Sequence, residues 1–542
     1  MKNKKADILF INAKVVTMED DCPYAEAVAI RDNKILFVGK DREALDYADS
    51  DTEVINLRGR LLLPGFIESH CHAIYYAEQC AAIKISGDTT NSRKKVLEQV
   101  ANAAAKVPEG TWLFGWGWDE ARFEEGPEPL NRHILDSIVP NHPVFLKRAC
   151  GHVGVLNSLG LKLSGIDKNY VVPEGGNVFL DKNGEPTGIV AGKVQNDIPF
   201  PKATDQQLRV ALEDTVQDEF LSKGVTTTSE MAAEPRFVRI HQQLRKEDKL
   251  RIRMRFYEMA RSNINFQGQL HNAISMGIES GLGDDFLKFS GMKYLMDGSC
   301  GGKTAAISEP YVGDPENYGT LYNSLEDLKS DFIDGAKGGL QPCIHAIGDR
   351  AIEMALQALE AAAEAGADIP AMRVRFEHVE LPSKDHIERF KKLGIVVGLS
   401  AGFIYSLGDS HNNVLGSERI KQAFPARSLL DAGLTVACNS DCPVCDINPL
   451  WGICAMVTRE TMGGVSFGKE QSASVMEALK GYTTSAAYAT FDEDKLGSIK
   501  AGKLADLVVL EEDIFSITPE KIKDVKVLTT MVDGKILYSR NS

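Results

Sequence analysis

Eight strand-like segments alternate with helical segments through the middle of this chain, and this alternation constrains the fold more than any other feature. The strand-like segments are short apolar runs, and they lie at 63–69, 225–230, 252–257, 291–296, 340–344, 373–377, 395–399 and 434–439. Helical patterns lie between most of them, for example over 205–221, 350–365, 384–393 and 474–488. Eight such units in a row predict a closed parallel barrel, the (β/α)8 or TIM barrel. An open doubly wound sheet is the alternative that this pattern allows.

Three regions lie outside this alternation. Residues 1–61 and 490–542 contain short strands, beginning with one expected over 7–16, and we expect them to form one composite β-sandwich. Residues 62–489 then form the barrel. Residues 74–204 follow the first barrel strand, and we expect them to be an insertion subdomain, because barrels carry insertions in the loops of the catalytic face. The predicted fold is therefore α/β, a distorted barrel with a β-sandwich built from both termini.

Composition and charge exclude several classes of protein. The chain has 542 residues, 43% hydrophobic and 25% charged, which is enough to bury a large core and argues against disorder. Its formal net charge of −15 would repel phosphate backbones and anionic lipids, so we expect no nucleic-acid partner and no membrane partner. No apolar run approaches the ~20 residues of a membrane span, and the first apolar run, 8–11, is too short for a signal peptide. We therefore expect a cytoplasmic protein.

Potential metal ligands fall at the carboxyl ends of the predicted barrel strands. They are four of the eleven histidines, one aspartate and, within the fourth strand, one lysine: His70, His72, His345, His378, Asp441 and Lys293. His70 and His72 share one strand face, because side chains at i and i+2 point the same way. A single histidine at a strand end is more often structural, but catalytic groups of this barrel gather at these ends. Imidazole and carboxylate ligands suit Zn²⁺, with Mn²⁺, Fe²⁺ and Co²⁺ as alternatives.

Alternating aromatic residues mark one strand of the predicted insertion. Trp112, Phe114, Trp116 and Trp118 recur at every second position, so we expect them to share one face. The face either packs into the core of the insertion or forms the wall of a substrate pocket. Both hold if Trp112 and Phe114 are in the core while Trp116 or Trp118 contacts substrate.

The motifs around these residues resemble the amidohydrolase superfamily and, within it, the amidohydrolase-3 (YtcJ-like) subgroup. The likeness is carried by Leu-Pro-Gly-Phe-Ile-Glu-Ser-His-Cys-His at 63–72, Gly-Trp-Gly-Trp-Asp at 115–119, His-Ala-Ile-Gly-Asp-Arg at 345–350 and Ser-Asp-Cys-Pro-Val at 440–444. Further matches are Gly-His at 151–152, Asp-Gly-Ser at 297–299, Glu-His at 377–378 and Gly-Lys-Leu-Ala-Asp-Leu at 502–507. The resemblance implies a hydrolase of carbon–nitrogen bonds on a distorted barrel with a composite sandwich.

The resemblance also implies a role for each ligand. His70, His72 and Asp441 would hold one metal ion, and His345 and His378 a second, so that the chain binds two Zn²⁺. Lys293 would bridge them after carboxylation by CO₂, since a carbamate is an anionic ligand and an ammonium is not. A metal-activated hydroxide would attack the amide, with Asp441 as the proton shuttle. His152 resembles a family histidine that faces the metal site and polarises the carbonyl or holds the substrate; a structural histidine is the alternative.

Three functions remain open. The first is a binuclear hydrolase of a small-molecule amide such as an N-acyl or N-formyl compound. The second is a mononuclear deaminase or cyclic-amide hydrolase of the same superfamily, which would not need Lys293 as a ligand. The third is a non-catalytic binding protein on the same barrel, against which the intact ligand set argues. The sequence is compatible with a homodimer.

Overall fold

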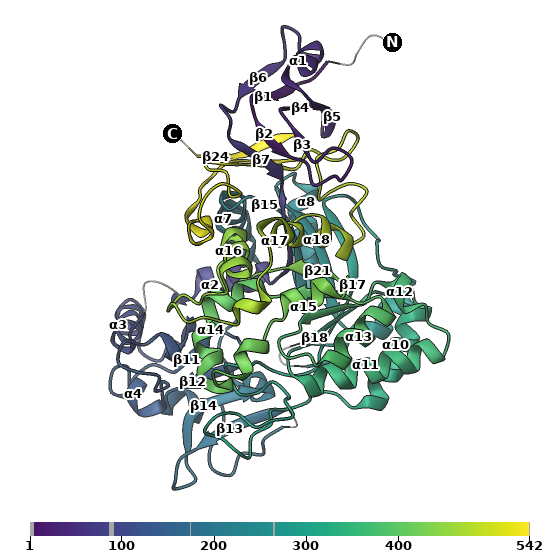
Figure 1. Ribbon diagram of the computed structural model, residues 1–542. Coiled ribbons are helices and arrows are strands. Elements are labelled where there is room, and N and C mark those ends of the chain that lie inside the picture. Colours follow the sequence, from purple (N-terminus) through teal and green to yellow (C-terminus); the bar gives the residue numbers. More distant parts are fainter. Residues whose placement is uncertain (1–4, 86–90, 174, 264–265, 541–542) are drawn as a thin grey trace.

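A parallel barrel forms the centre of the molecule (Figure 1). The computed structural model describes residues 5–85, 91–173, 175–263 and 266–540. Eight strands neighbour one another in chain order: β8 (Phe66–Cys71), β15 (Val225–Ala233), β16 (Arg253–Met259), β17 (Leu287–Leu295), β18 (Pro342–Ala346), β19 (Arg375–His378), β20 (Val396–Leu399) and β21 (Thr435–Cys438). The predicted fold class is confirmed, and the open doubly wound sheet is excluded by this arrangement.

The barrel is distorted where its first and last strands meet. In the described residues β8 and β21 form no regular ladder. Instead the Ser69 hydroxyl donates to the Cys438 carbonyl at 2.9 Å, and the Asp441 amide donates to the His70 carbonyl at 3.2 Å. The seam therefore brings the end of β21 directly beside the end of β8.

Amphipathic helices cover the outside of the barrel. The longest of them, α11 (Asp349–Glu364), turns a row of alanine and large aliphatic residues inward, and α10 (Leu325–Lys337) packs beside it. The helix expected over 205–221 is interrupted by a π-helical turn at 212–216 between α6 (Asp205–Ala211) and α7 (Gln217–Ser222). Within the described ranges, none of the helices combines the length and apolar character that crossing a bilayer requires.

Two further sheets, at the top of Figure 1, contain the strands of the chain ends. One sheet has the order β5-β4-β1-β6; the other, β24-β23-β22-β7-β2-β3, mixes strands from both ends of the chain. Their bounds are β1 (Ile8–Ile11), β2 (Lys14–Val16), β3 (Tyr24–Ala25), β4 (Ala27–Arg31), β5 (Lys34–Gly39), β6 (Glu53–Asn56), β7 (Leu61–Pro64), β22 (Leu507–Leu510), β23 (Val527–Val532) and β24 (Lys535–Ser539). Apolar side chains of both sheets, including Phe10 and Val509, meet in one buried cluster.

Two expected strands are each divided in the structure. The strand expected over 7–16 breaks at Asn12, which has a left-handed φ of 50°, and its halves β1 and β2 join different sheets. The strand expected over 63–69 breaks at Gly65, where β7 leaves the sandwich and β8 enters the barrel. A Cβ at Gly65 would lie 2.4 Å from the Thr226 side chain, so the close approach of β15 requires glycine there.

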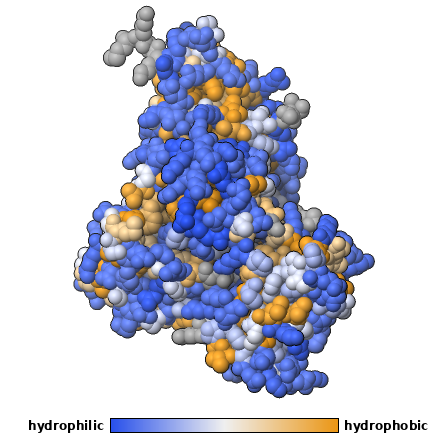
Figure 2. Space-filling model, turned by 180° about the vertical axis from the view of Figure 1, so that it is seen from behind, coloured by the Kyte–Doolittle hydropathy of each residue, from blue (hydrophilic) through white to orange (hydrophobic). Residues whose placement is uncertain are grey.

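The segment of the chain between β8 and β15 forms a mixed sheet, which lies at the opposite end of the molecule from the sandwich in Figure 1. Its order is β13-β14-β12-β11-β10-β9, with bounds β9 (Ile83–Lys84), β10 (Leu113–Trp118), β11 (Val144–Arg148), β12 (Val153–Leu156), β13 (Gly176–Leu180) and β14 (Pro186–Gly192). The residue limits expected for the three domains remain predictions, and residues 1–4, 86–90, 174, 264–265 and 541–542 of those ranges lie outside the described residues. On the face in Figure 2 hydrophilic residues predominate and hydrophobic ones form small groups, as on most protein surfaces.

Candidate metal centre

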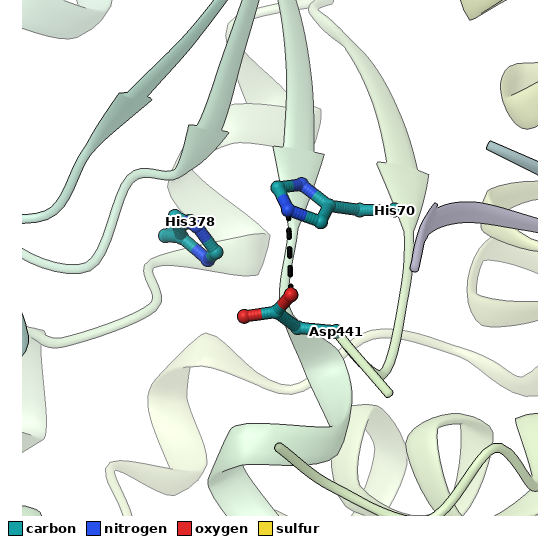
Figure 3. Close-up of side chains that lie close together, drawn as sticks. All are labelled: His70, His378 and Asp441. Carbon is teal, nitrogen blue, oxygen red and sulfur yellow. Dashed lines mark ion pairs between the residues drawn. The ribbon is translucent and has the colours of Figure 1, made fainter. Parts of the chain in front are cut away.

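The predicted ligands gather at the carboxyl end of the barrel. His70, His378 and Asp441 point toward one another (Figure 3), are buried, and place one ligand atom each within 4.8 Å of the others. His72 Nε2 lies 3.1 Å from Asp441 Oδ1, and Lys293 Nζ lies 3.3 Å from His70 Nε2. All six predicted ligands line one cavity: His70, His72, Lys293, His345, His378 and Asp441.

Backbone strain marks two of these positions. His378 and Asp441 have φ values of 73° and 55°, in the left-handed region that residues with a Cβ rarely occupy. Such a conformation costs about 1–3 kcal/mol and persists where the surrounding structure imposes it, which is common at functional sites. The strain turns both side chains toward the centre at the point where their strands end.

Hydrogen bonds fix which nitrogen of each imidazole is free. Nδ1 of His70 lies 2.7 Å from Oε2 of Glu377, and Nδ1 of His72 lies 2.7 Å from the carbonyl oxygen of Met231. Both partners are acceptors, so each Nδ1 carries the proton and donates. Each Nε2 is therefore left with a lone pair, the form that binds a metal ion.

His378 and His345 follow the same logic with different nitrogens. Ser400 donates its hydroxyl proton to Asn439 Oδ1 at 2.9 Å and accepts from Nδ1 of His378 at 2.7 Å, so Nε2 of His378 is free. His345 Nε2 donates to the Gly298 carbonyl at 3.0 Å, so its free nitrogen is Nδ1. The ring of His345 lies 4.4 Å from that of His378, centroid to centroid. The two imidazoles therefore offer different nitrogens, Nδ1 of His345 and Nε2 of His378, in the same cavity.

Glu377 was not predicted as a site residue, yet it orients His70. Its second oxygen, Oε1, accepts from Arg375 Nε at 2.8 Å, and both side chains are fully buried. Burial raises the pKa of Glu377, but Arg375 and His70 outweigh this effect and hold the pKa well below its usual range. A Cβ at Gly398 would lie 2.2 Å from Oε2, so glycine on β20 leaves room for the carboxylate.

Burial keeps two of the imidazoles, those of His70 and His378, neutral. Burial, with a contribution from Lys293, lowers the pKa of His70 to about 4, and burial likewise lowers that of His378. Burial alone raises the pKa of Asp441, but the neighbouring His70, His72 and Lys293 favour its carboxylate form, outweigh burial and lower the pKa. Near pH 7 the site therefore presents neutral imidazoles at His70 and His378 and a carboxylate at Asp441, which are the protonation states of metal ligands.

The donor set fits a divalent cation. Among the described residues, no donor reaches the buried Asp441 Oδ1 in hydrogen-bond geometry, although two imidazole Nε2 atoms lie at 3.1 and 3.3 Å. Burial lowers the pKa of Lys293, which favours the neutral amine, the form that reacts with CO₂. Nitrogen and carboxylate donors around one point suit Zn²⁺ best, and Mn²⁺, Fe²⁺ and Co²⁺ are compatible.

A second buried group was also absent from the predictions. Cys300, Glu380 and His411 lie together beside the cavity, and His411 Nε2 is 3.0 Å from Glu380 Oε2. The negative charge of Glu380 raises the pKa of His411 against the opposing effect of burial. The arrangement is an ion pair between elements distant in sequence, for which no local pattern gives a signal.

His152 lies in the cavity wall beside the predicted ligands. Its ring centroid is 5.7 Å from that of His345. Nδ1 is buried and lacks a hydrogen-bond partner within the described part of the chain, and burial lowers its pKa to about 3. A neutral imidazole with an unused nitrogen in the cavity is suited to contact a substrate.

The two tryptophans expected near the substrate lie on different sides of the insertion sheet. Trp116 lines the cavity, with its ring 5.6 Å from that of Tyr75. Trp118 is buried in the core of the insertion, where it stacks on Phe123. The expectation that Trp118 shares the face of Trp116 is wrong, because Gly117 has a φ of 115° and the pairing register shifts there, which reverses the alternation.

Comparison with known proteins relates this geometry to a family. A family model described as the amidohydrolase family matches residues 53–538. The chain belongs to the amidohydrolase family. It is therefore a metal-dependent hydrolase that acts on carbon–nitrogen bonds, which confirms the expected enzyme class and argues against the non-catalytic alternative.

Individual relatives match this amidohydrolase along nearly its whole length. YtcJ of Bacillus subtilis (strain 168) is 30% identical over 97% of this chain and 98% of its own. N-substituted formamide deformylase of Arthrobacter pascens is 28% identical over 98% of each chain. The crystal structure of an uncharacterized metal-dependent hydrolase from Pyrococcus horikoshii OT3 matches with a TM-score of 0.73 at 25% identity, over 94% of this chain and 99% of that one. The predicted resemblance to the YtcJ-like subgroup is thus confirmed.

Proposed function

We propose that this amidohydrolase hydrolyses the amide bond of an N-acyl or N-formyl small molecule with two zinc ions. His70, His72 and Asp441 would hold one ion through Nε2, Nε2 and a carboxylate oxygen. His345 and His378 would hold the second through Nδ1 and Nε2. The observation that carries the proposal is that four imidazoles, three of them buried and that of His72 partly exposed, line the same cavity with an acceptor on one nitrogen, which leaves the other nitrogen unprotonated.

Lys293 completes this proposed ligand set. Its Nζ is buried and 3.3 Å from a free imidazole nitrogen, and in the described residues no carboxylate lies within 4.0 Å of it. An ammonium there would repel two dications, whereas a carbamate formed with CO₂ supplies two anionic oxygens. We therefore propose that Lys293 is carboxylated and bridges the ions.

The chemistry then divides between the ions and the side chains. Divalent ions bound there would activate a water and polarise the scissile carbonyl. Asp441, through the carboxylate oxygen that does not hold the ion, would accept a proton from the attacking water and pass it to the leaving nitrogen. His152, with its unused nitrogen in the cavity, hydrogen-bonds the carbonyl oxygen and holds the amide in place. The relative from Arthrobacter pascens, an N-substituted formamide deformylase, supports an N-formyl or N-acyl substrate.

A mononuclear enzyme of the same family is the second candidate. It is favoured by the observation that one trio, His70, His378 and Asp441, has ligand atoms within 4.8 Å of one another. Such an enzyme, a deaminase or cyclic-amide hydrolase, would bind one ion and leave Lys293 unmodified.

A substrate screen tests the proposal. Protein loaded with Zn²⁺ or Mn²⁺ is assayed against N-formyl amines, N-acyl amines and cyclic amides, with chelator-treated protein as the control. We expect release of free amine from the first two classes by loaded protein alone. Turnover of cyclic amides alone would favour the mononuclear candidate, and absence of turnover with every class would refute both.

A further inference from the structure

Lys147 is a buried cation on the cavity wall that the proposed chemistry does not use. It lies on β11 of the insertion sheet, is 7% exposed, and lines the same cavity as His72, His152 and Asp441. Its Nζ lies 4.7 Å from the centroid of the Trp116 ring. The insertion thus places one positive charge over an aromatic ring at the edge of the metal centre.

The ammonium of Lys147 has no anionic partner of its own. In the part of the chain that the structure describes, no carboxylate lies within 4.0 Å of Nζ and no acceptor is hydrogen-bonded to it. Its neighbour Arg148 differs, since it pairs with Asp119 at 2.7 Å and with Glu120 at 2.9 Å. Glu78 on α2 (Ala73–Ala81) attracts Lys147 only from a longer distance. Burying a charge without a partner is costly, and among the described residues no anionic group in contact with Lys147 offsets that cost. A bound anion would offset it.

A second unused donor lies beside it. Trp116 Nε1 is buried and lacks an acceptor within the described residues. Aromatic rings adjoin these two donors in the cavity lining: the ring of Tyr75 lies 5.6 Å from that of Trp116, and the ring of Phe266 lies 6.2 Å from that of Tyr75. An ammonium and an indole N–H in apolar surroundings favour an anionic group with acceptor oxygens, carried on an apolar or aromatic framework.

We propose that Lys147 binds a carboxylate of the substrate, so that the substrate class is an N-acyl or N-formyl amino acid with an apolar side chain. That the bound molecule is a substrate rests on the proposed function, whereas the binding of a carboxylate by Lys147 does not. Lys147 is a specificity-determining residue in this account, because it contacts the part of the molecule that does not react. The insertion would select for the charge and the barrel would cleave the amide.

The kinetic test uses two substrates that differ in one group. N-formyl-phenylalanine carries the carboxylate, and N-formyl-phenethylamine lacks it. We expect zinc-loaded wild type to prefer the first, and Lys147→Met to lower the ratio of the two kcat/KM values about 10- to 100-fold, as expected for one lost charge-assisted hydrogen bond. Lys202→Met is the matched control, because Lys202 is an exposed cation whose charge acts on Lys147 through space. It should change the ratio less than about 3-fold.

A binding measurement separates this inference from the proposed function. Calorimetry with 3-phenylpropionate and zinc-loaded protein requires no turnover, so it remains decisive if neither formamide is hydrolysed and the proposed function fails. We expect its Kd to rise about 10- to 100-fold in Lys147→Met, and in Lys147→Gln should the first variant misfold. An equal Kd in wild type and variant, with circular dichroism unchanged, would overturn the assignment, as would an equal rise in Lys202→Met.

Discussion

Replacing Glu377 with glutamine should weaken metal binding although Glu377 is not itself a proposed ligand. The carboxylate accepts from His70 Nδ1 at 2.7 Å through one oxygen and from Arg375 Nε at 2.8 Å through the other. A glutamine keeps one acceptor and gains an NH₂ donor. Because Arg375 cannot lose its proton, the amide oxygen must face Arg375 and the NH₂ must face His70.

The consequence is a change of tautomer at His70. Facing a donor, Nδ1 becomes the acceptor and the proton moves to Nε2, the nitrogen that lies 3.3 Å from Asp441 Oδ1. The lone pair needed for the metal is then lost. Removing a partner that orients a metal-binding histidine costs about 10- to 100-fold in affinity, or about 1.4–2.8 kcal/mol. Arg375 also loses its buried counter-charge, which should lower the free energy of unfolding by about 3–5 kcal/mol.

Two assays measure these effects. Competition with a chromophoric chelator gives the Zn²⁺ affinity, and urea denaturation of metal-free protein gives the free energy of unfolding. The control is Glu493→Gln, which removes a carboxylate 2.6 Å from Arg373, on a partly exposed side chain. It should cost at most about 1 kcal/mol and leave Zn²⁺ affinity unchanged. Wild-type Zn²⁺ affinity in Glu377→Gln would refute the tautomer argument.

The remaining predictions concern the proposed ligands. His70→Ala and His72→Ala should each lose metal and activity while far-UV circular dichroism stays unchanged; normal metal content with retained turnover would contradict their assignment. Lys293→Ala should hold less metal, and short-chain carboxylic acids with bicarbonate should partly restore activity by replacing the carbamate; mass spectrometry or electron density that shows an unmodified amine in fully loaded protein would favour the mononuclear enzyme. Asp441→Asn should still bind metal but have kcat lowered at least about 100-fold, because an amide cannot accept the proton. Near-normal turnover of Asp441→Asn would show that another residue is the base, with His152 the first candidate.

The barrel was predictable because its signal is local. Each βα unit shows its own hydrophobic period, and eight units in order leave few arrangements. The divided strands were not predictable, since the break at Gly65 depends on the approach of Thr226 from a distant strand. The reversal at Trp118 was missed for a similar reason: alternation in sequence predicts one face only while the strand has no bulge, and Gly117 introduces one.

That the candidate ligands lie together was predictable, while the groups that orient them were not. A histidine at the end of a barrel strand can be located from the sequence, and that rule selected the residues that the structure brings together. Glu377 and Ser400 act on histidines through tertiary contacts, which leave no periodic pattern. Arg148 and Lys147 are adjacent in the sequence, yet Arg148 is paired with Asp119 while Lys147 lies over Trp116, and only tertiary packing within the insertion distinguishes them.

The central claim is that the carboxyl end of the barrel holds two divalent ions. Metal content per chain, measured by mass spectrometry on protein expressed with zinc and then freed of loosely bound ions, tests it most directly. The account predicts about two ions per chain in wild type and at most about one in His72→Ala, which loses a ligand of one ion only. One ion per chain in fully active wild type would contradict the binuclear centre, and active protein without bound metal would contradict the metal centre altogether.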